Sequence, residues 1–547
     1  MSSALPRGAL LVLALALALT WFGALGQRKL VKPDEGRYGE IPREMVASGD
    51  WLTPRLNGLK YFEKPPLQYW ATAAAFSVFG VSEWATRLWG ALCGFAAVLL
   101  AYHVGRRLYG EAAGPPAAAA LAGSALFVAM SQVATLDMGV SAFLSLAVFA
   151  VVLAQLDDTP QRERLAWMLA GWAAMALAVL SKGLIGLVLP MGAVALYVLW
   201  QRDFGLLRRL HLVPGATLFL LIAAPWFVAV SAANPEFARF FFVHEHFERF
   251  LTAQHDRPGP AWYFVPVLFL GFFPWLLSLA AGLWRAARTA EPARFRPTRF
   301  LLAWCIAVFA FFSLSSSKLP PYILPMFPAL ALLVGAQLAG ASRRLLVAQC
   351  GLAALLGLAV LALLARDAAP AWLRSAQHLE AYRPWLLAAG GSLALLSLVA
   401  AALAWRGRRL ASIIVLAAGG LACAQLALLG HESLSPIYSA YDVVSKARPR
   451  LPPDARFYAV GQYDHTLPFY LGRTVTMVAQ PEELRVPVTW EPEKFIPDLG
   501  AFADAWRRAG AACAAFAPAQ LDAIRAAHGL QARVIATGAR YLIACKP

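Results

Sequence analysis

Long apolar runs alternate with short polar loops along the first 430 residues. The runs lie at residues 8–26, 86–104, 116–131, 138–155, 165–181, 184–200, 212–231, 262–284, 300–315, 321–341, 345–365, 385–405 and 410–430. A helix needs about 20 such residues to cross about 30 Å of hydrocarbon, so the pattern predicts thirteen transmembrane helices. The apolar stretch 68–80 would cover only about 20 Å as a helix and is predicted to lie along the membrane interface.

Arginine falls in every second loop between these runs, at Arg7, Arg106, Arg107, Arg162, Arg164, Arg202, Arg208, Arg209, Arg285, Arg288, Arg294, Arg296, Arg299, Arg343, Arg344, Arg406, Arg408 and Arg409. This side is predicted to face the cytoplasm, because Lys and Arg accumulate in cytoplasmic loops. The other side receives loops 27–85, 232–261, 316–320 and 366–384, with interfacial helices expected in the first two, and the tail after residue 430. Residues 1–26 also resemble a signal peptide, and whether they are cleaved or kept as an anchor stays open.

The tail, residues 431–547, has a different pattern from the rest of the chain. ARFYAVGQ, TVTMVA and RYLIACK are predicted strands, and LGAFADAWRRAGA and AQLDAIRAAHG are predicted amphipathic helices. The tail is therefore expected to be a small α/β domain outside the cytoplasm, where a disulfide between Cys513 and Cys545 is possible. The chain contains neither a P-loop nor a dinucleotide-binding glycine pattern, so an energy source has to arrive with the substrate.

Charged residues make up 14% of the chain and hydrophobic ones 60%, and the net charge is +17. The positive charge is spread among membrane segments, which argues against nucleic-acid binding and favours anionic lipid or a lipid-linked phosphate as the partner. The stretch KPDEGRYGE, residues 32–40, nevertheless concentrates ionisable side chains in the first outward loop, including the adjacent acids Asp34 and Glu35.

Five cations come from separate outward segments: Lys64, Arg87, Lys182, Arg249 and Lys318. If the helices close around a cavity, these side chains would line it with few acids to neutralise them, and such a cavity suits a phosphate or diphosphate. Lys182 and Asp137 each stand alone at the mouth of an apolar run, where a charge is costly unless it has a partner. Taken singly, lysines at helix ends commonly extend to the headgroups instead, and the DEGRY charges could form a solvated network.

The segment FVHEHFERF places two histidines among aromatic residues. Imidazole from His244, with or without His246, and carboxylate from Glu63 are ligands that a divalent metal accepts. Because the spacing HxH alone does not specify a metal, both a bound ion and its absence stay open.

Four motifs, in this order along the chain, resemble those of a known enzyme family: DEGRY, YFEKPPL, LSKG and SSSKLPPYILP. They are similar to motifs of the 4-amino-4-deoxy-L-arabinose lipid A transferases, which are GT-C glycosyltransferases and kin to the protein O-mannosyltransferases. The resemblance covers most of the chain. It implies a polytopic α-helical GT-C domain over residues 1–430 and a periplasmic α/β domain over residues 431–547.

The resemblance also implies roles for single residues. Asp34 would be the key catalytic carboxylate, Lys64, Arg249 and Lys182 would hold the donor phosphate, and Glu63, Tyr61 and Tyr322 would shape the pocket. Apart from the resemblance, Glu35 and Asp137 are further catalytic candidates, and the further substrate-binding candidates are Arg37, Tyr38, Arg87 and Lys318. The HEHF segment around His244 matches the family less clearly, which leaves its role open.

The implied reaction moves 4-amino-4-deoxy-L-arabinose from undecaprenyl phosphate to a lipid A phosphate at the periplasmic face of the bacterial inner membrane. The product would bind polymyxin and cationic peptides less well, because its negative charge is reduced. No cofactor is required, since the donor is already activated, and a single displacement with inversion and a monomeric enzyme are expected. Two alternatives stay open: transfer to protein hydroxyls or another glycolipid, and a lipid flippase, although the chain lacks the internal repeats typical of transporters.

Overall fold

The computed structural model describes residues 7–248, 259–365 and 379–547. The chain divides into two compact units. The helical unit comprises residues 1–24, 63–68 and 89–430, and the tail unit comprises residues 25–62, 69–88 and 431–547. The hydropathy pattern does not predict that residues 25–62 and 69–88 group with the tail, and the predicted boundary at residue 430 stays a prediction of domain organisation.

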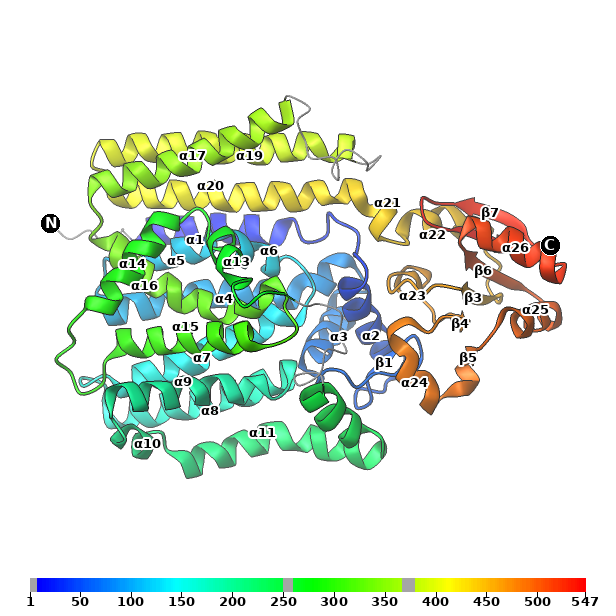
Figure 1. Cartoon of the computed structure of the whole chain (residues 1–547), viewed down its shortest axis with the longest axis horizontal. Coiled ribbons are helices and arrows are strands. Elements are labelled where there is room, and N and C mark those ends of the chain that lie inside the picture. Colours follow the sequence, from blue (N-terminus) through cyan, green and yellow to red (C-terminus); the bar gives the residue numbers. More distant parts are fainter. Residues whose placement is uncertain (1–6, 249–258, 366–378) are drawn as a thin grey trace. The chain divides into compact units, whose positions relative to one another are not determined.

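The helical unit consists almost entirely of long apolar helices. In chain order they are α1 (Arg7–Gly23), α4 (Glu83–Tyr109, whose first turns belong to the tail unit), α5 (Gly114–Ala122), α6 (Ala125–Ser131), α7 (Leu136–Gln155), α8 (Gln161–Lys182), α9 (Ile185–Gln201), α10 (Gly205–Arg209), α11 (Leu212–Ala233), the π-helix η1 (Arg239–Glu248), α13 (Phe264–Gly271), α14 (Leu276–Arg288), α15 (Pro297–Leu314), the 3-10 helix η2 (Pro320–Met326), α16 (Phe327–Ala339), α17 (Arg343–Ala365), α19 (Leu379–Trp405) and α20 (Arg409–Gly430). Helices α17, α19 and α20 lie side by side (Figure 1).

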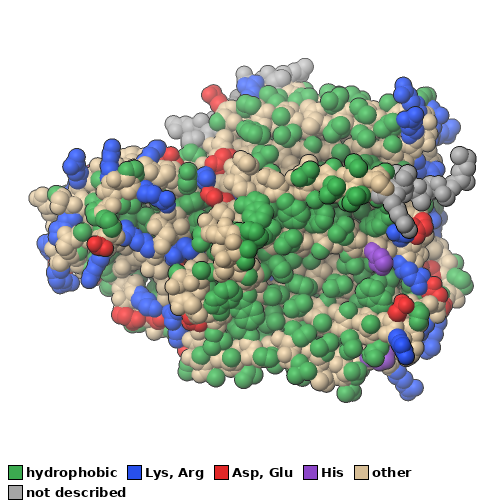
Figure 2. Space-filling model, turned by 180° about the vertical axis from the view of Figure 1, so that it is seen from behind, with side chains coloured by type: hydrophobic (Ala, Val, Ile, Leu, Met, Phe, Trp, Pro, Cys, Tyr) green, Lys and Arg blue, Asp and Glu red, His purple; other side chains and the backbone are tan. Residues whose placement is uncertain are grey.

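Within the described residues, nine helices are long and apolar enough to cross a membrane, and the number rises to eleven if two bent helix pairs each count as one span. Two shorter apolar helices, Gly8–Gly23 and Ile185–Gln201, complete the set. Each of the thirteen predicted segments coincides with one of these helices or pairs. Figure 2 shows hydrophobic side chains covering the visible face of this unit, as a lipid-facing surface requires. The chain is a polytopic α-helical membrane protein.

Two predicted spans are not single helices, which corrects the predictions for 116–131 and 262–284. Helices α5 and α6 meet at 68°, and α13 and α14 at 113°. A hydrogen bond connects the two breaks, because the backbone N–H of Ala125 donates to the carbonyl of Phe273 at 3.0 Å. A backbone group released from its own helix inside hydrocarbon needs such a partner. Hydropathy averages over a window and does not reveal the bend.

The arginine-bearing loops of the helical unit lie together at one end (Figure 1). Arg107 donates to both carboxylate oxygens of Asp158, at 2.8 and 2.7 Å, and so joins two of these loops. Arg296 and Arg299 both donate to the side-chain oxygen of Gln201, at 2.6 and 3.0 Å. The grouping of the arginines on one side agrees with the sequence pattern, and the membrane face to which they belong stays a prediction.

The tail unit begins with elements from the first outward segment. These are α2 (Asp34–Ser48), a hairpin of β1 (Arg55–Leu56) and β2 (Leu59–Lys60), and α3 (Leu67–Phe79). Helix α3 matches the predicted short helix at 68–80. The turn between β1 and β2 is formed by Asn57 and Gly58 with φ of 55° and 79°, the left-handed conformations that an Asn-Gly hairpin turn requires. The Asn57 amide pairs with both backbone groups of Val475, at 2.7 Å each, and so fastens the hairpin to the tail.

The rest of the tail unit forms a mixed six-stranded sheet with its helices. Its elements are η3 (His431–Leu434), α21 (Ser435–Tyr438), α22 (Tyr441–Ala447), η4 (Arg448–Arg450), β3 (Arg456–Val460), α23 (Leu467–Leu471), β4 (Thr476–Val478), η5 (Glu482–Leu484), α24 (Arg485–Trp490), η6 (Pro492–Lys494), β5 (Phe495–Ile496), α25 (Leu499–Arg508), β6 (Ala512–Phe516), α26 (Pro518–His528), β7 (Arg533–Thr537) and β8 (Leu542–Cys545). The strand order is β5-β4-β3-β6-β8-β7. The three predicted strands and both predicted helices are confirmed, whereas β5, β6, β7 and the shorter helices were not predicted.

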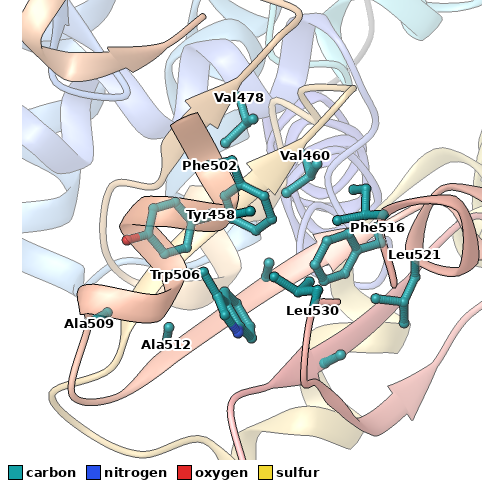
Figure 3. Close-up of a cluster of buried hydrophobic side chains, with 14 of the residues drawn as sticks. Tyr458, Val460, Val478, Phe502, Trp506, Ala509, Ala512, Phe516, Leu521 and Leu530 are labelled. Carbon is teal, nitrogen blue, oxygen red and sulfur yellow. The ribbon is translucent and has the colours of Figure 1, made fainter. Parts of the chain in front are cut away.

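Strands β3, β4, β5 and β6 pair in parallel, and β8 pairs antiparallel with both β6 and β7. Figure 3 shows the core on one face of this sheet, where Phe502 and Trp506 of α25 pack against Tyr458 and Phe516 of the strands. Cys513 and Cys545 lie opposite each other on β6 and β8 and form the disulfide that the sequence left open.

Candidate functional site

The DEGRY motif opens helix α2. Pro33 occupies the N-cap position, and Asp34 and Glu35 lie in the first turn, where negative charge is favoured by the helix dipole. Gly49 ends the helix in the left-handed conformation. The helix is polar in sequence but buries most of its residues, from Glu35 to Met45, within the tail unit. A stretch that looks like a charged loop is therefore a buried helix that exposes Asp34 at its start.

Asp34 is held by a chain of charged contacts from the tail. Arg37 donates from Nη1 to Asp34 Oδ1 at 2.9 Å, and its Nε donates to Glu483 Oε1 at 2.9 Å while Nη2 donates to Glu483 Oε2. His465 Nε2 lies 2.8 Å from Glu483 Oε1. Although burial alone would raise the pKa of Glu483, the hydrogen bond to His465 and the charge of Arg37 lower it to about 2. The Asp34 side chain remains 52% exposed, so its carboxylate is both fixed and accessible.

The Arg37 guanidinium is engaged within the tail unit, and its predicted contact with a substrate stays a prediction. Each of its three guanidinium nitrogens already donates to a carboxylate of this unit, and Arg37 is buried. The rings of Tyr38 and Tyr61 lie 5.7 and 5.9 Å from its guanidinium carbon, and Tyr38 also stacks on Tyr69. Both tyrosines are buried and support Arg37, and their contact with a substrate stays a prediction.

Glu35 and Arg87 form a fully buried pair in the tail unit. Arg87 donates to both oxygens of Glu35, at 2.7 and 2.8 Å, and to the backbone carbonyls of Leu25, Arg28 and Lys29. All five of its N–H groups are used. Both side chains join α2 to the start of α4. The catalytic role of Glu35 and the phosphate-binding role of Arg87 stay predictions.

The helical unit contains a second group of predicted residues. Lys182 at the end of α8 pairs with Asp137 in the first turn of α7, and its Nζ lies 5.1 Å from the ring centre of Tyr322 on η2. The side chains of Lys182 and Asp137 are 16% and 14% exposed. The two charges that stand alone in the sequence are thus each other's partner, with an aromatic ring beside the cation.

Two lysines of this unit have different surroundings. Lys64 is half-buried and donates to the carbonyl of the neighbouring Glu63 at 2.8 Å. Lys318 is 5% exposed and donates to the carbonyls of Phe312, Ser313 and Ser315, at 3.4, 2.9 and 2.8 Å. Three bonds satisfy an ammonium group. Lys318 therefore caps the end of α15, and its predicted role in substrate binding, like that of Lys64, stays a prediction.

Arg249 and the side chains of His244 and His246 lie outside the described residues. Among the residues that are described, no three or more His, Cys, Asp or Glu side chains are grouped as metal ligands. The predicted metal site of Glu63 and His244 depends on a side chain outside this set and stays a prediction.

The sequence does not predict the two residues that hold Arg37, namely Glu483 directly and His465 through Glu483. Arg37 and Glu483 are 446 positions apart, so no local pattern connects them. The nearest signal is compositional: PEEL and YDHT each place ionisable residues between predicted elements of a domain that is otherwise built on apolar strands.

Two family models match the chain. The model described as "Dolichyl-phosphate-mannose-protein mannosyltransferase" matches residues 8–241, and the model described as "Aminoarabinose transferase C-terminal domain" matches residues 443–546. The first covers part of the helical unit and the start of the tail unit, and the second covers the sheet domain.

Known proteins are similar over larger parts of the chain. An undecaprenyl phosphate-alpha-4-amino-4-deoxy-L-arabinose arabinosyl transferase of Pseudomonas fluorescens is 38% identical over 341 residues, which are 61% of this chain and 58% of that protein. The match to this curated relative thus spans less than two thirds of its length. The crystal structure of ArnT from Cupriavidus metallidurans bound to undecaprenyl phosphate is 37% identical, with a TM-score of 0.92, over 99% of this chain and 98% of that one. Its apo structure is 39% identical, with a TM-score of 0.90, over 98% of each chain.

Proposed function

This chain belongs to the aminoarabinose transferase family of GT-C membrane proteins, and we propose that it transfers 4-amino-4-deoxy-L-arabinose from undecaprenyl phosphate to a phosphate of lipid A. The observation that carries this proposal is the similarity to ArnT bound to undecaprenyl phosphate, which extends over both units at 37% identity. The transfer takes place at the periplasmic face of the inner membrane, on the side opposite the arginine-rich loops.

The reaction is a single displacement at C1 of the sugar. The bond between C1 and the carrier phosphate oxygen breaks, and its electron pair leaves with undecaprenyl phosphate. An oxygen of the lipid A phosphate supplies the electron pair of the new C1–O bond, so the configuration at C1 inverts. Because this phosphate is already ionised near neutral pH, with a second pKa of about 6, the acceptor does not need a general base.

Asp34 then has an electrostatic role. Positive charge develops on the sugar ring as the C1–O bond lengthens, and a fixed carboxylate stabilises that charge more in the transition state than in the ground state. The half-exposed carboxylate at the start of α2, held by Arg37, has the accessibility and the fixed position that this role requires. Lys64, Lys182 and Arg249 are the cations proposed to bind the carrier phosphate. The enzyme acts as a monomer, and the reaction requires no cofactor.

One observation favours a second acceptor class. The mannosyltransferase family model matches residues 8–241, and its proteins transfer sugar to protein. A serine or threonine hydroxyl keeps its proton until attack, so a protein acceptor would make Asp34 a general base, worth roughly 10²–10⁴-fold in rate. The model that matches the tail favours aminoarabinose over mannose as the sugar, and lipid A stays the proposed acceptor.

The test uses the full-length protein in proteoliposomes with undecaprenyl phosphate-aminoarabinose and lipid A, and mass spectrometry of both lipids. We expect lipid A to gain an aminopentose while the carrier loses it. Asp34→Asn should lower transfer to a small residual rate without changing thermal unfolding. The matched control is Asp442→Asn, because Asp442 also lies in the first turn of a helix, α22, and pairs with Lys446 at 2.8 Å.

Three outcomes would contradict the proposal. Full activity of Asp34→Asn would remove the mechanism, and transfer to a serine- or threonine-containing peptide instead of lipid A would change the acceptor. Movement of the donor between leaflets without its consumption would indicate a flippase.

A further inference from the structure

We propose that residues 463–466 of the tail hold the Asp34 carboxylate in one position, and that His465 is the residue of this segment through which the effect reaches Asp34. The proposal rests on the function proposed above, because Asp34 is catalytic only for that reaction. It makes the tail domain part of the machinery that orients the carboxylate, through two contacts within the tail unit.

The positioning segment is itself rigidly held. Asp464 is buried, and its Oδ1 accepts from the backbone N–H and the hydroxyl of Thr466, at 2.8 and 2.6 Å. Its Oδ2 accepts from Arg540 at 2.7 Å and from the hydroxyl of Tyr541. Both oxygens of the carboxylate are therefore used, one within the segment and one on the loop before β8. A side chain carried by this segment has little freedom to move.

The first contact runs through side chains. His465 lies 2.8 Å from Glu483 Oε1, and Glu483 binds Arg37 with both oxygens. Arg37 in turn donates to Asp34 at 2.9 Å. A long arginine side chain and a half-exposed aspartate would each sample several rotamers without this support. The imidazole orients the Glu483 carboxylate, which orients the guanidinium, which selects one position of Asp34.

The second contact is between backbones. A Cβ placed on Gly36 would lie 2.6 Å from the carbonyl carbon of His465 and 2.7 Å from the nitrogen of Thr466. Real Cβ atoms do not approach so closely, so only glycine allows the first turn of α2 to pack directly on this segment. Gly36 lies between Asp34 and Arg37 in the motif. The tail therefore determines both where the turn lies and how its side chains point.

The decisive variants are His465→Ala and His465→Gln, measured for transfer in proteoliposomes. His465→Ala should lower kcat about tenfold or more, since a misplacement on the order of 1 Å costs up to about 10²-fold, while the donor KM stays within about twofold. His465→Gln should recover most of the loss, because its side-chain amide can donate to Glu483. The control is His528→Ala in the last turn of α26, which should leave kcat unchanged.

A double variant tests whether His465 acts through Asp34. In an Asp34→Asn background, the change His465→Ala should cost no further residual activity. Thermal unfolding of each variant, and the intact Cys513–Cys545 disulfide, check that the tail remains folded.

The outcomes separate the two proposals. Wild-type kcat in His465→Ala, or an additive loss in the double variant, overturns the positioning role and leaves the proposed function standing. A loss that glutamine does not recover and that follows the unfolding temperature shows a structural role only, and also overturns it. Absence of transfer by the wild-type protein overturns the proposed function, and the positioning of Asp34 falls with it.

Discussion

Arg87 binds both carboxylate oxygens of Glu35, at 2.7 and 2.8 Å, and neither side chain is reached by solvent. Glu35 follows Asp34 directly in the DEGRY motif, so two adjacent acids have opposite surroundings. The Asp34 carboxylate is half exposed, whereas both oxygens of Glu35 accept from the buried Arg87, which also donates to three backbone carbonyls. The motif therefore combines an accessible acid with a buried acid that anchors the start of α4.

Removing one partner of this pair should destabilise the protein. Glu35→Ala leaves the Arg87 charge buried and uncompensated, and such changes cost about 3–5 kcal/mol. We expect a large fall in the unfolding temperature in detergent, with activity lost only in proportion to the folded fraction. The matched control is Asp504→Asn, which breaks the exposed pair with Arg507 and should change stability by less than about 1 kcal/mol. A variant at Glu35 that stays folded but inactive would restore the predicted catalytic role.

Lys318 should behave as a helix cap. Lys318→Met removes three hydrogen bonds to the carbonyls at the end of α15, and we expect a loss of about 1–3 kcal/mol in stability. The affinity for undecaprenyl phosphate, measured by equilibrium binding in nanodiscs, should not change among the molecules that remain folded. Weaker binding with unchanged thermal unfolding would mean that Lys318 contacts the phosphate after all.

The sequence predicts the helices well for a physical reason. A span must be apolar along its whole length, so a window of hydropathy detects it without knowledge of any partner. A hydropathy window does not reveal the bend between α5 and α6. The backbone N–H of Ala125 that is released there donates to the carbonyl of Phe273, which is distant in the sequence. Hydropathy does not detect helix α2 either, because its residues are polar although they are buried within the tail unit.

The sequence shows which side chains are charged, but it does not show which groups they pair with. The sequence groups Arg87 and Lys318 with the phosphate-binding cations because they come from separate outward segments, and Lys318 also has no acid beside it. The structure pairs Arg87 with an acid 52 positions away and Lys318 with backbone carbonyls, which no pattern of side chains can reveal. Asp137 and Lys182, by contrast, stand out individually in the sequence because each lies at the mouth of an apolar run, but no local pattern predicts their pairing across 45 positions.

The Asp137–Lys182 pair should be coupled in function as well as in structure. Asp137→Ala and Lys182→Ala should each reduce transfer, because either change leaves a partly buried charge without its partner. The double variant should lose less than the sum of the two, with a coupling energy of about 0.5–3 kcal/mol. Transfer rates of the wild type, both single variants and the double variant give this value. Strictly additive losses would indicate that the two residues act independently.

Glu44 should make the tail unit less stable as the pH rises. Burial, followed by the charge of neighbouring Glu40, raises the pKa of Glu44 well above its ordinary value of 4.5. Because the folded protein keeps a proton that the unfolded chain releases, this contribution to stability is complete below about pH 4.5 and is lost as the pH rises through the folded pKa. Glu44→Gln is neutral at every pH and can still accept from the backbone N–H of Gly58, as Glu44 does at 2.8 Å. We therefore expect the variant to unfold at a higher temperature than the wild type at alkaline pH, and the difference to shrink towards about pH 4.5.

The measurement is thermal unfolding in detergent across this pH range, with Glu493→Gln as the control, since Glu493 is exposed on η6 and should give no difference. If Glu44→Gln were less stable than the wild type at alkaline pH, the Glu44 carboxylate would have to be ionised in the folded protein. Arg43, which binds Glu40 at 2.7 and 2.6 Å, would then have to neutralise both acids.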